Sequence, residues 1–291
     1  MMNNIEYLKK QNIQFNSIDE NAAQQIMENE YPCYKLYEYS HLFKYSHFLD
    51  FSLLYYLAVL DEKLRHIVIC NCLDLEQSLK TIIIDDSERL AVKDSVLEDY
   101  FKLDGEYLLS YYNSDNIDYF NNEEISNSIS SLSFEQFLEV IQFGTFEKFL
   151  HFFYKKYAIS LYNKEYAPYE CHINSVKRLR NISAHNGLLI GSLDKKREIS
   201  SDKVASFLGS HGIKHKTLRS NMSKQTVFDI CNLLHLCFLV LPKTKFENTL
   251  AQLNDFLQKD CKQYKHVYSN NSLLVSVYNF TNSVVDIYAN C

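Results

Sequence analysis

Glycine and proline are scarce in this chain, with six Gly and three Pro among 291 residues. All-β sandwiches and glycine-rich nucleotide-binding folds need many turns with special backbone angles, which these two residue types supply. The scarcity argues against both architectures and favours a chain dominated by helices. We therefore expect an all-α fold.

The clearest helical pattern runs from Phe51 to about Ile84, where apolar residues recur at steps of three and four. A second pattern begins at Ser133, which can act as a cap together with Gln136. Gly144 interrupts this pattern, so a kink or a helix–turn–helix is expected there. Further helices are expected over residues 146–157, 170–184, 224–241 and 245–261.

Polar and β-branched segments separate these helices. Asn186-Gly187 directly follows the helix expected to end at Ala184, and such a pair commonly stops a helix with a left-handed residue. The polar segments 107–132 and 191–220 are expected to be loops. The β-branched runs at 81–84 and 273–277 fit either a strand or a buried helix.

We predict one helical domain, although the polar segment 107–132 leaves a division into two lobes open. In chain order it comprises an N-terminal elaboration over about residues 1–50, core helices over 51–190, a basic loop over 191–224 and C-terminal helices over 225–291.

With 291 residues, 46% of them hydrophobic, the chain can bury a sizeable core. Its eight cysteines include no CxxC pair, so reduced and mostly buried thiols are expected. The N-terminus has no apolar signal-peptide core, and no apolar stretch approaches the ~20 residues that span a bilayer. We expect a soluble protein of the cytoplasm with no membrane partner.

The formal net charge of -6 argues against a basic coat protein for nucleic acid. One segment differs, because residues 195–224 contain eight Lys and Arg against two acidic residues. A solvated basic loop and a phosphate-binding surface both fit this segment. Its basic residues are Lys195, Lys196, Arg197, Lys203, Lys214, Lys216, Arg219 and Lys224.

The segment with the most chemical information is Val176–Asn186, in which four residues separate Arg180 from His185. A bare R-x4-6-H pattern occurs too often by chance to be trusted alone. Arg178 satisfies the same spacing, so either arginine could be the functional one. On a continuous helix, residues five apart lie about 140° apart, so convergence of Arg180 and His185 needs a break or a second subunit.

Four segments together resemble known families. Arg180-Asn181 followed by His185 resembles the R-N-x-x-x-H signature of HEPN ribonucleases. Three others resemble blocks of the Abi-like family in the expected order, over about residues 5–240. They are the segments starting at Tyr34-Lys35-Leu36, at Leu60-Asp61-Glu62 with Glu76 downstream, and at Glu139-Val140-Ile141. This chain departs from the first block, since Lys35 replaces an arginine and Tyr37-Glu38 replaces Ser-Gly.

The resemblance implies a HEPN-type helical bundle and a metal-independent endoribonuclease toxin that acts in abortive-infection phage defence. It implies Arg180, His185 and Asn181 as catalytic residues, no cofactor, RNA as substrate, and a homodimer whose two motif helices form one composite site. It also implies a silencing partner, either a non-coding RNA or a protein antitoxin. The residues expected to bind RNA are Arg178, Lys177, Lys195, Lys196, Arg197, Lys214, Lys216 and Arg219, with Glu76, Lys35 and Tyr34 as possible supporting residues.

The chemistry agrees with this expectation. Cleaving RNA without a metal needs a base, an acid and a cation over the phosphorane, and imidazole and arginine supply these roles. Alternatives stay open: a non-catalytic RNA-binding HEPN module or scaffold, a toxin that works by nucleotide transfer, or a structural role in which Arg180 pairs with a core carboxylate such as Glu76 and His185 caps a helix.

Other chemistries fit less well. The adjacent carboxylates Asp85-Asp86 and Glu123-Glu124 point apart and do not suit a metal site. His211 and His215 have a metal-ligand spacing, but Gly212 and the expected loop favour a solvated or RNA-facing pair. The chain has no phosphate-binding glycine motif and no nucleophile-elbow motif.

Overall fold

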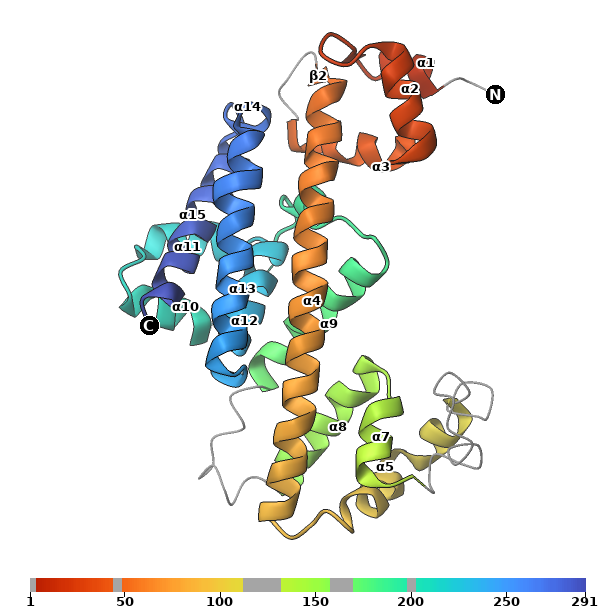
Figure 1. The fold of residues 1–291 in the computed structure, drawn as a ribbon, viewed down its shortest axis with the longest axis vertical. Helices are drawn as coiled ribbons and strands as arrows, with labels where there is room; N and C mark the ends of the chain where they lie inside the picture. Colours follow the sequence, from red (N-terminus) through yellow and green to blue (C-terminus); the bar gives the residue numbers. More distant parts are fainter. Residues whose placement is uncertain (1–3, 44–48, 112–131, 158–169, 198–202) are drawn as a thin grey trace. The chain divides into compact units, whose positions relative to one another are not determined.

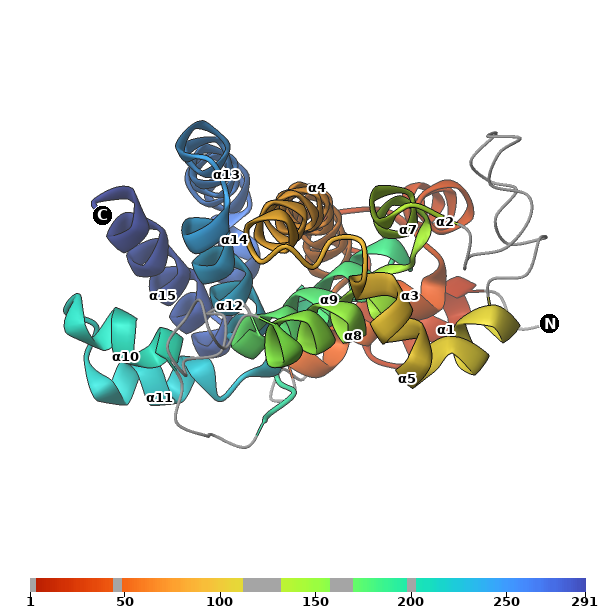
Figure 2. The same cartoon turned by 90° about the horizontal axis from the view of Figure 1, so that it is seen from below.

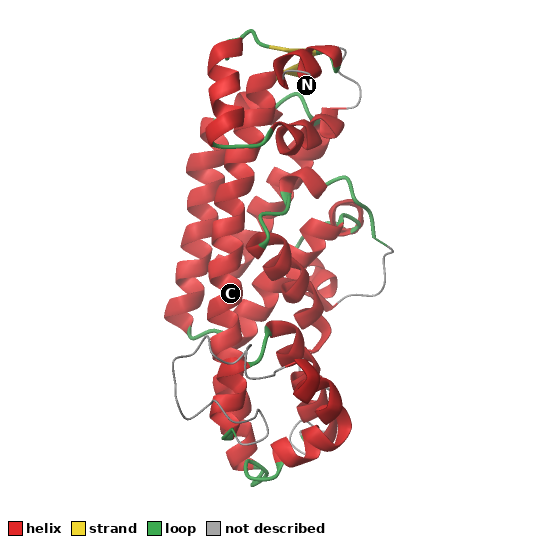
Figure 3. Cartoon of the chain, turned by 90° about the vertical axis from the view of Figure 1, so that its right-hand side faces the viewer, coloured by secondary structure: helices red, strands yellow, loops and turns green. Residues whose placement is uncertain are grey.

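A computed structural model describes residues 4–43, 49–111, 132–157, 170–197 and 203–291, with the side chains of 104–111, 170 and 171 left out. Helices make up nearly all of this part, as Figure 3 shows, and its only sheet is one parallel pair of two-residue strands. The all-α prediction is confirmed. Most of the polar segment 107–132 lies outside the described residues.

The chain forms two compact units, each assembled from separate segments. The first contains Met1–Cys72, Arg178–Phe238 and Pro242–Cys291, and the second contains Leu73–Lys177 and Leu239–Leu241. The division falls within three helices, namely α4 (Phe51–Arg89), α9 (Glu170–Ala184) and α12 (Gln225–Val240).

The first unit begins with short elements that lead into α4. They are α1 (Asn4–Lys10), β1 (Ile13–Gln14), α2 (Glu20–Asn29), α3 (Cys33–Glu38), the 3-10 helix η1 (Tyr39–Phe43) and β2 (Leu49–Asp50). Ile13 pairs with Leu49 in the sheet. The Asp50 carboxylate accepts hydrogen bonds from the backbone N–H groups of Asn16 (2.9 Å) and Ser52 (3.0 Å), which ties the first turn of α4 to the N-terminal segment.

Helix α4 confirms the predicted long helix and continues five residues beyond it, to Arg89 (Figure 1). The run 81–84 is therefore helical and not a strand. Its predicted apolar face is buried at Leu57, Leu60, Leu64, Val68, Cys72, Leu75 and Leu79.

The second unit adds α5 (Val96–Tyr111), α7 (Phe134–Val140) and α8 (Phe143–Lys156) to parts of α4 and α9 (Figure 2). Aromatic side chains join these helices: the ring centroid of Phe149 lies 5.0 Å from that of Tyr100 and 5.5 Å from that of Phe137. Such edge-to-face pairs stabilise a core beyond the area that they bury.

The predicted cap at Ser133 is confirmed, since Ser133 and Gln136 form a complete capping box. The predicted interruption between two helices is confirmed, but not at Gly144, which lies in the first turn of α8. The helices separate at Ile141 and Gln142, whose extended backbone (ψ 140° and 153°) changes the chain direction. This earlier break allows Ile141 and Phe143 both to be buried.

The basic segment is not a loop throughout, contrary to the prediction for 191–224. It contains the 3-10 helix η5 (Ile190–Ser192) and the helices α10 (Lys203–Ser210) and α11 (His215–Met222). Val204 and Leu208 are buried on α10, and Leu218 and Met222 on α11, so each short helix buries an apolar pair at i, i+4.

The C-terminal part of the first unit is helical as expected. Helix α12 ends before Pro242, and the last elements are α13 (Lys243–Asp255), the π-helix η6 (Phe256–Cys261), α14 (Lys265–Tyr268) and α15 (Ser272–Ala289). The run 273–277 therefore lies in a helix. No helix of the described chain combines the length and apolarity needed to cross a membrane. None of the seven cysteines with described side chains forms a disulfide, and four of them, Cys72, Cys231, Cys237 and Cys261, are buried; Cys171 is not among the seven.

Candidate functional site

Helix α9 carries the Arg180 to His185 motif and has the bounds that the sequence predicted, Glu170–Ala184. One side of its C-terminal half is buried through Leu179 and Ser183, whereas Asn181 and His185 are exposed. The motif therefore lies at a helix end with part of its surface open to solvent.

The helix ends in a Schellman motif. His185 still donates its N–H to the carbonyl of Asn181 (3.1 Å), Asn186 donates to Ser183 (3.2 Å), and Gly187 donates to Ile182 (2.7 Å). Asn186 is the left-handed residue, with φ 52°, which confirms the stop predicted from Asn186-Gly187. A Cβ atom on Gly187 would lie 2.9 Å from Ile182 Cγ2, so this position needs glycine.

The backbone break comes one residue after His185, not before it. Because the His185 amide keeps its helical hydrogen bond, His185 and Arg180 remain about 140° apart around the helix axis. The break that convergence of the two side chains would need is therefore not present between Arg180 and His185. Within one chain, the helix does not turn the two side chains toward each other.

The two candidate arginines differ in their partners. Arg178 donates to both carboxylate oxygens of Asp229 (Nε–Oδ2 3.1 Å, NH2–Oδ1 2.6 Å), and Gln225 donates to the same carboxylate. Arg180 is half-buried, and its Nε has no hydrogen-bond partner among the described residues. It forms no ion pair with a carboxylate in that part of the chain, so the alternative of a core ion pair is not supported.

A buried carboxylate on α4, Asp61, binds the chain directly after the motif. Its Oδ1 accepts hydrogen bonds from the N–H groups of Leu189 (3.0 Å) and Ile190 (2.9 Å). Its Oδ2 accepts one from the hydroxyl of Tyr39 (2.6 Å) and lies 3.5 Å from Arg65 NH1. Burial raises the pKa of the Asp61 carboxyl, and these donors act in the opposite direction.

Two cations bind the carbonyls of the same segment. Lys35 Nζ donates to the Asn186 carbonyl (2.7 Å), and Arg65 NH1 donates to the Gly187 carbonyl (3.3 Å). Burial, followed by the nearby charge of Arg65, lowers the pKa of Lys35. We call Asp61, Tyr39, Lys35 and Arg65 the Asp61 cluster; together they fix residues 186–190 through backbone groups.

The other predicted supporting residues lie elsewhere. Tyr34 is 67% exposed on α3. Glu76 pairs with Lys80 on α4 (3.0 Å), and Lys177 pairs with Glu147 on α8 (2.5 Å), both within the second unit. Burial acts to raise the pKa of Glu147, but hydrogen bonds from His151 and Lys177 outweigh it and hold the pKa below its usual range.

The basic residues of 195–224, which include the predicted RNA-binding ones, have unequal exposure. The exposed ones are Lys195, Lys196, Lys203, Lys214, Lys216 and Arg219. The guanidinium of Arg197 lies 3.3 Å from the ring centroid of Phe228, and Lys224 is 9% exposed and donates to the Ser220 carbonyl. Backbone bonds from Arg197 to Ser223 (2.9 Å) and from Gln225 to Lys195 (3.0 Å) hold the segment against the start of α12.

Sequence reasoning missed Asp61 and Asp229 as residues that organise the motif. Asp61 stands in the Leu60-Asp61-Glu62 block, but the residue of that block predicted to support the site was Glu76, downstream of it. Tyr39 stands in the first block, so two of the segments that resembled the Abi-like family meet at the motif's exit. That convergence was the signal available in the sequence.

Comparison with known proteins agrees with this arrangement. The family described as Abi-like protein matches residues 25–191, which is more than half of the chain and contains both the motif and the Asp61 cluster. No curated protein and no solved structure matches the chain. The family match indicates a function related to abortive infection. The chain belongs to the Abi-like protein family.

Proposed function

We propose that this protein is a metal-independent endoribonuclease toxin of the HEPN type, acting in abortive-infection phage defence in the cytoplasm, with Arg180 and His185 as its catalytic pair. The observation that carries the proposal is the contrast between the two arginines. Asp229 pairs with Arg178, whereas Arg180 has no counter-ion among the described residues and stands five residues before the exposed His185. An arginine without a counter-ion is suited to bind a phosphate.

The reaction would proceed through the ribose itself. A histidine removes the proton of the 2′-OH, whose oxygen attacks phosphorus, and the bond from phosphorus to the 5′ oxygen breaks. A second group acts as an acid and protonates the leaving 5′ oxygen, which gives a 2′,3′-cyclic phosphate and a 5′-OH end. Arginine stabilises the charge that develops on the phosphoryl oxygens.

A homodimer would supply the groups that one chain lacks. Arg180 and His185 of one chain point in different directions around α9, and one chain offers a single motif histidine. Two copies with their α9 ends together would offer two histidines and two arginines at one site, with Asn181 beside His185 at i, i+4 on the exposed side.

The exposed cations of the basic segment would bind the backbone of RNA, either the substrate or a silencing RNA. Six of them are exposed on an otherwise acidic protein, so attraction of RNA would be local. A protein antitoxin is the other candidate for the silencing partner.

Inducible expression in a bacterial host tests the catalytic proposal. Wild type, Arg180→Ala and His185→Ala are compared by RNA end-mapping with detection of 2′,3′-cyclic phosphates. His66→Ala, which removes an exposed histidine of α4, is the matched control. We expect new cyclic-phosphate ends and growth arrest with wild type and His66→Ala, and neither with the two motif variants.

Equal RNA profiles for all four proteins, with any silencing partner shown to be absent, would contradict catalysis. The basic segment would then favour the second candidate function, a non-catalytic RNA-binding HEPN module or scaffold. Filter binding of labelled RNA by the same variants then shows whether the protein binds RNA without cleaving it or does not bind RNA at all.

A further inference from the structure

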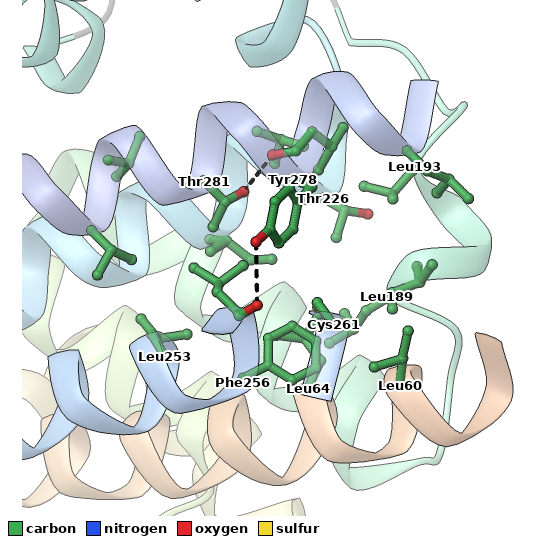
Figure 4. A pocket seen from close by; sticks show the side chains of 18 of the residues that line it. Leu60, Leu64, Leu189, Leu193, Thr226, Leu253, Phe256, Cys261, Tyr278 and Thr281 are labelled. Carbon is green, nitrogen blue, oxygen red and sulfur yellow. Dashed lines mark hydrogen bonds between the residues drawn. The ribbon is translucent and has the colours of Figure 1, made fainter. Parts of the chain in front are cut away.

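A cavity of about 100 Å³ lies inside the first unit. Figure 4 shows side chains of α4, α12, α13 and α15 around it, with Leu189 and Leu193 on one side. Its walls are mostly Leu, Val, Ile and Phe, and none of the described residues that line it is charged. The cavity is therefore an apolar space within a helical core.

Four residues that line the cavity carry a hydroxyl group, Thr226, Tyr268, Tyr278 and Thr281, and two of these groups donate to backbone carbonyls. Tyr278 donates to the Leu257 carbonyl (3.4 Å) and Thr281 to the Val277 carbonyl (2.9 Å), as the dashed lines in Figure 4 show. Burial raises the pKa of the Cys261 thiol to about 12, so this group stays uncharged. Water in such a space needs two to four polar partners, and walls made mostly of aliphatic and aromatic side chains offer few of them, so an apolar occupant is favoured.

One wall of the cavity is the π-helix η6. This conformation is rare and is frequently found at functional sites. Phe256, Leu257 and Cys261 of η6 all line the cavity, while Asp260 of the same segment forms an ion pair with Lys63 of α4. The π-helix η6 is thus attached to α4 by an ion pair, and three of its side chains line the cavity.

Another part of the cavity wall belongs to the segment that follows the motif. The side chains of Leu189 and Ile190 line the cavity, while their N–H groups donate to Asp61. Any molecule in the cavity would contact residues four and five positions after His185. Occupancy and the order of this segment are therefore mechanically linked.

We propose that this cavity binds a small apolar molecule, an aromatic ring or a short hydrocarbon chain, and that the bound molecule restrains the Leu189–Ile190 segment. Apolar cavities of comparable size remain dry and bind benzene. The recognising groups are aliphatic and aromatic side chains, so a charged head group would have to stay outside. The binding itself does not rest on the ribonuclease proposal.

The test uses the full chain with benzene as the probe. We expect benzene to raise the thermal unfolding midpoint by roughly 2–4 °C. We also expect it to slow hydrogen exchange at the amides of Leu189 and Ile190. Val277→Phe places a ring in the cavity and should remove both effects, whereas Val275→Phe, on the same helix but outside the lining, should retain them.

The proposal would be overturned if benzene raised the unfolding midpoint of wild type no more than that of Val277→Phe. Unchanged hydrogen exchange at Leu189 and Ile190 in the presence of benzene would overturn it as well. If Val277→Phe fails to fold, Leu253→Ala takes its place, because it enlarges the cavity. This variant should gain affinity for naphthalene relative to wild type, and no gain would likewise overturn the proposal.

Discussion

Asp61 is a single side chain on which the segment after the motif depends. It is fully buried, and three donors from η1 and the 189–190 backbone reach its two oxygens, with Arg65 nearby. Hydrogen bonds to a charged group contribute more than neutral ones, and donors left without an acceptor in the core are costly. The cost of altering Asp61 is thus set by the groups that it would leave unpaired.

Asp61→Asn should lower the free energy of unfolding by about 1–3 kcal/mol, because the amide keeps the shape but loses the charge and one acceptor. Urea denaturation measures the change, and hydrogen exchange should become faster at Leu189 and Ile190. Asp94→Asn, at an exposed position, is the control and should have little effect. If Asp61→Asn and wild type were equally stable, the Asp61 cluster would not be what fixes the segment after the motif.

Gly187 and Gly144 form a matched pair for a second prediction. Gly187→Ala brings a Cβ within 2.9 Å of Ile182 Cγ2 and 3.1 Å of the Ile182 carbonyl oxygen, so the end of α9 must shift. Gly144→Ala meets nothing within 4 Å, in a helical turn where alanine is favoured.

We expect Gly187→Ala to lower the free energy of unfolding by about 1–2 kcal/mol and Gly144→Ala to leave it unchanged or raise it by up to about 1 kcal/mol. Thermal unfolding of the two variants beside wild type decides this. A Gly187→Ala protein as stable as Gly144→Ala would show that Ile182 gives way without strain.

At the scale of the element, α9 is joined to α12 by one ion pair. Asp229 is almost fully buried and takes its hydrogen bonds from Arg178 and Gln225. Arg178 is about half exposed, which weakens the pair through solvent screening, but the carboxylate left behind would be buried. Replacement of Arg178 and replacement of Arg180 should therefore have different effects on stability and on RNA cleavage.

Arg178→Ala should lower the free energy of unfolding by about 1–3 kcal/mol, whereas Arg180→Ala should change it by less than about 1 kcal/mol. RNA cleavage should show the reverse order, with Arg180→Ala inactive and Arg178→Ala retaining activity at temperatures where it is folded. Cleavage and urea denaturation of both variants test this. Loss of stability in Arg180→Ala alone would point to a structural role for that arginine.

The elements with a sustained apolar period were predictable, and the exceptions have physical reasons. Helices α4, α9 and α12 were predicted from apolar residues that recur at steps of three and four. The ends of α9 and α12 were also predicted, from Asn186 and Pro242 respectively. The helices α10 and α11 were hidden, since each has only eight residues and they lie in a segment that was predicted to be a loop from its many basic residues. The break between α7 and α8 was expected at Gly144 and lies at Ile141 and Gln142, because glycine is tolerated in a first helical turn.

The candidate site was predictable only in part. The motif and its helix end were evident, but one carboxylate on a long helix gives no sequence signal that it binds the amide of a residue 128 positions later. In the same way, Arg178 and Arg180 could not be separated, because Asp229 stands 51 residues farther along the chain. Long-range partners of single polar groups are a property of the packed structure.

For the whole molecule, the distribution of charge matters more than its sum. A formal charge of -6 opposes RNA binding at long range, while the exposed cations of α10 and α11 favour it locally. Binding through phosphates releases counter-ions, so the affinity falls with salt in proportion to the number of contacts. This relation allows the basic segment to be tested separately from catalysis.

Replacing Lys214, Lys216 and Arg219 together by Gln should weaken binding of single-stranded RNA. The slope of log affinity against log salt should fall in magnitude by about 0.7 for each phosphate contact removed, and so by about 2 for all three. Filter binding at several salt concentrations, in the His185→Ala background to prevent cleavage, measures the slope. Lys243, Lys245 and Lys262, exposed cations outside the basic segment, give the matched triple control. Equal slopes for the two triple variants would place the RNA surface elsewhere on the protein.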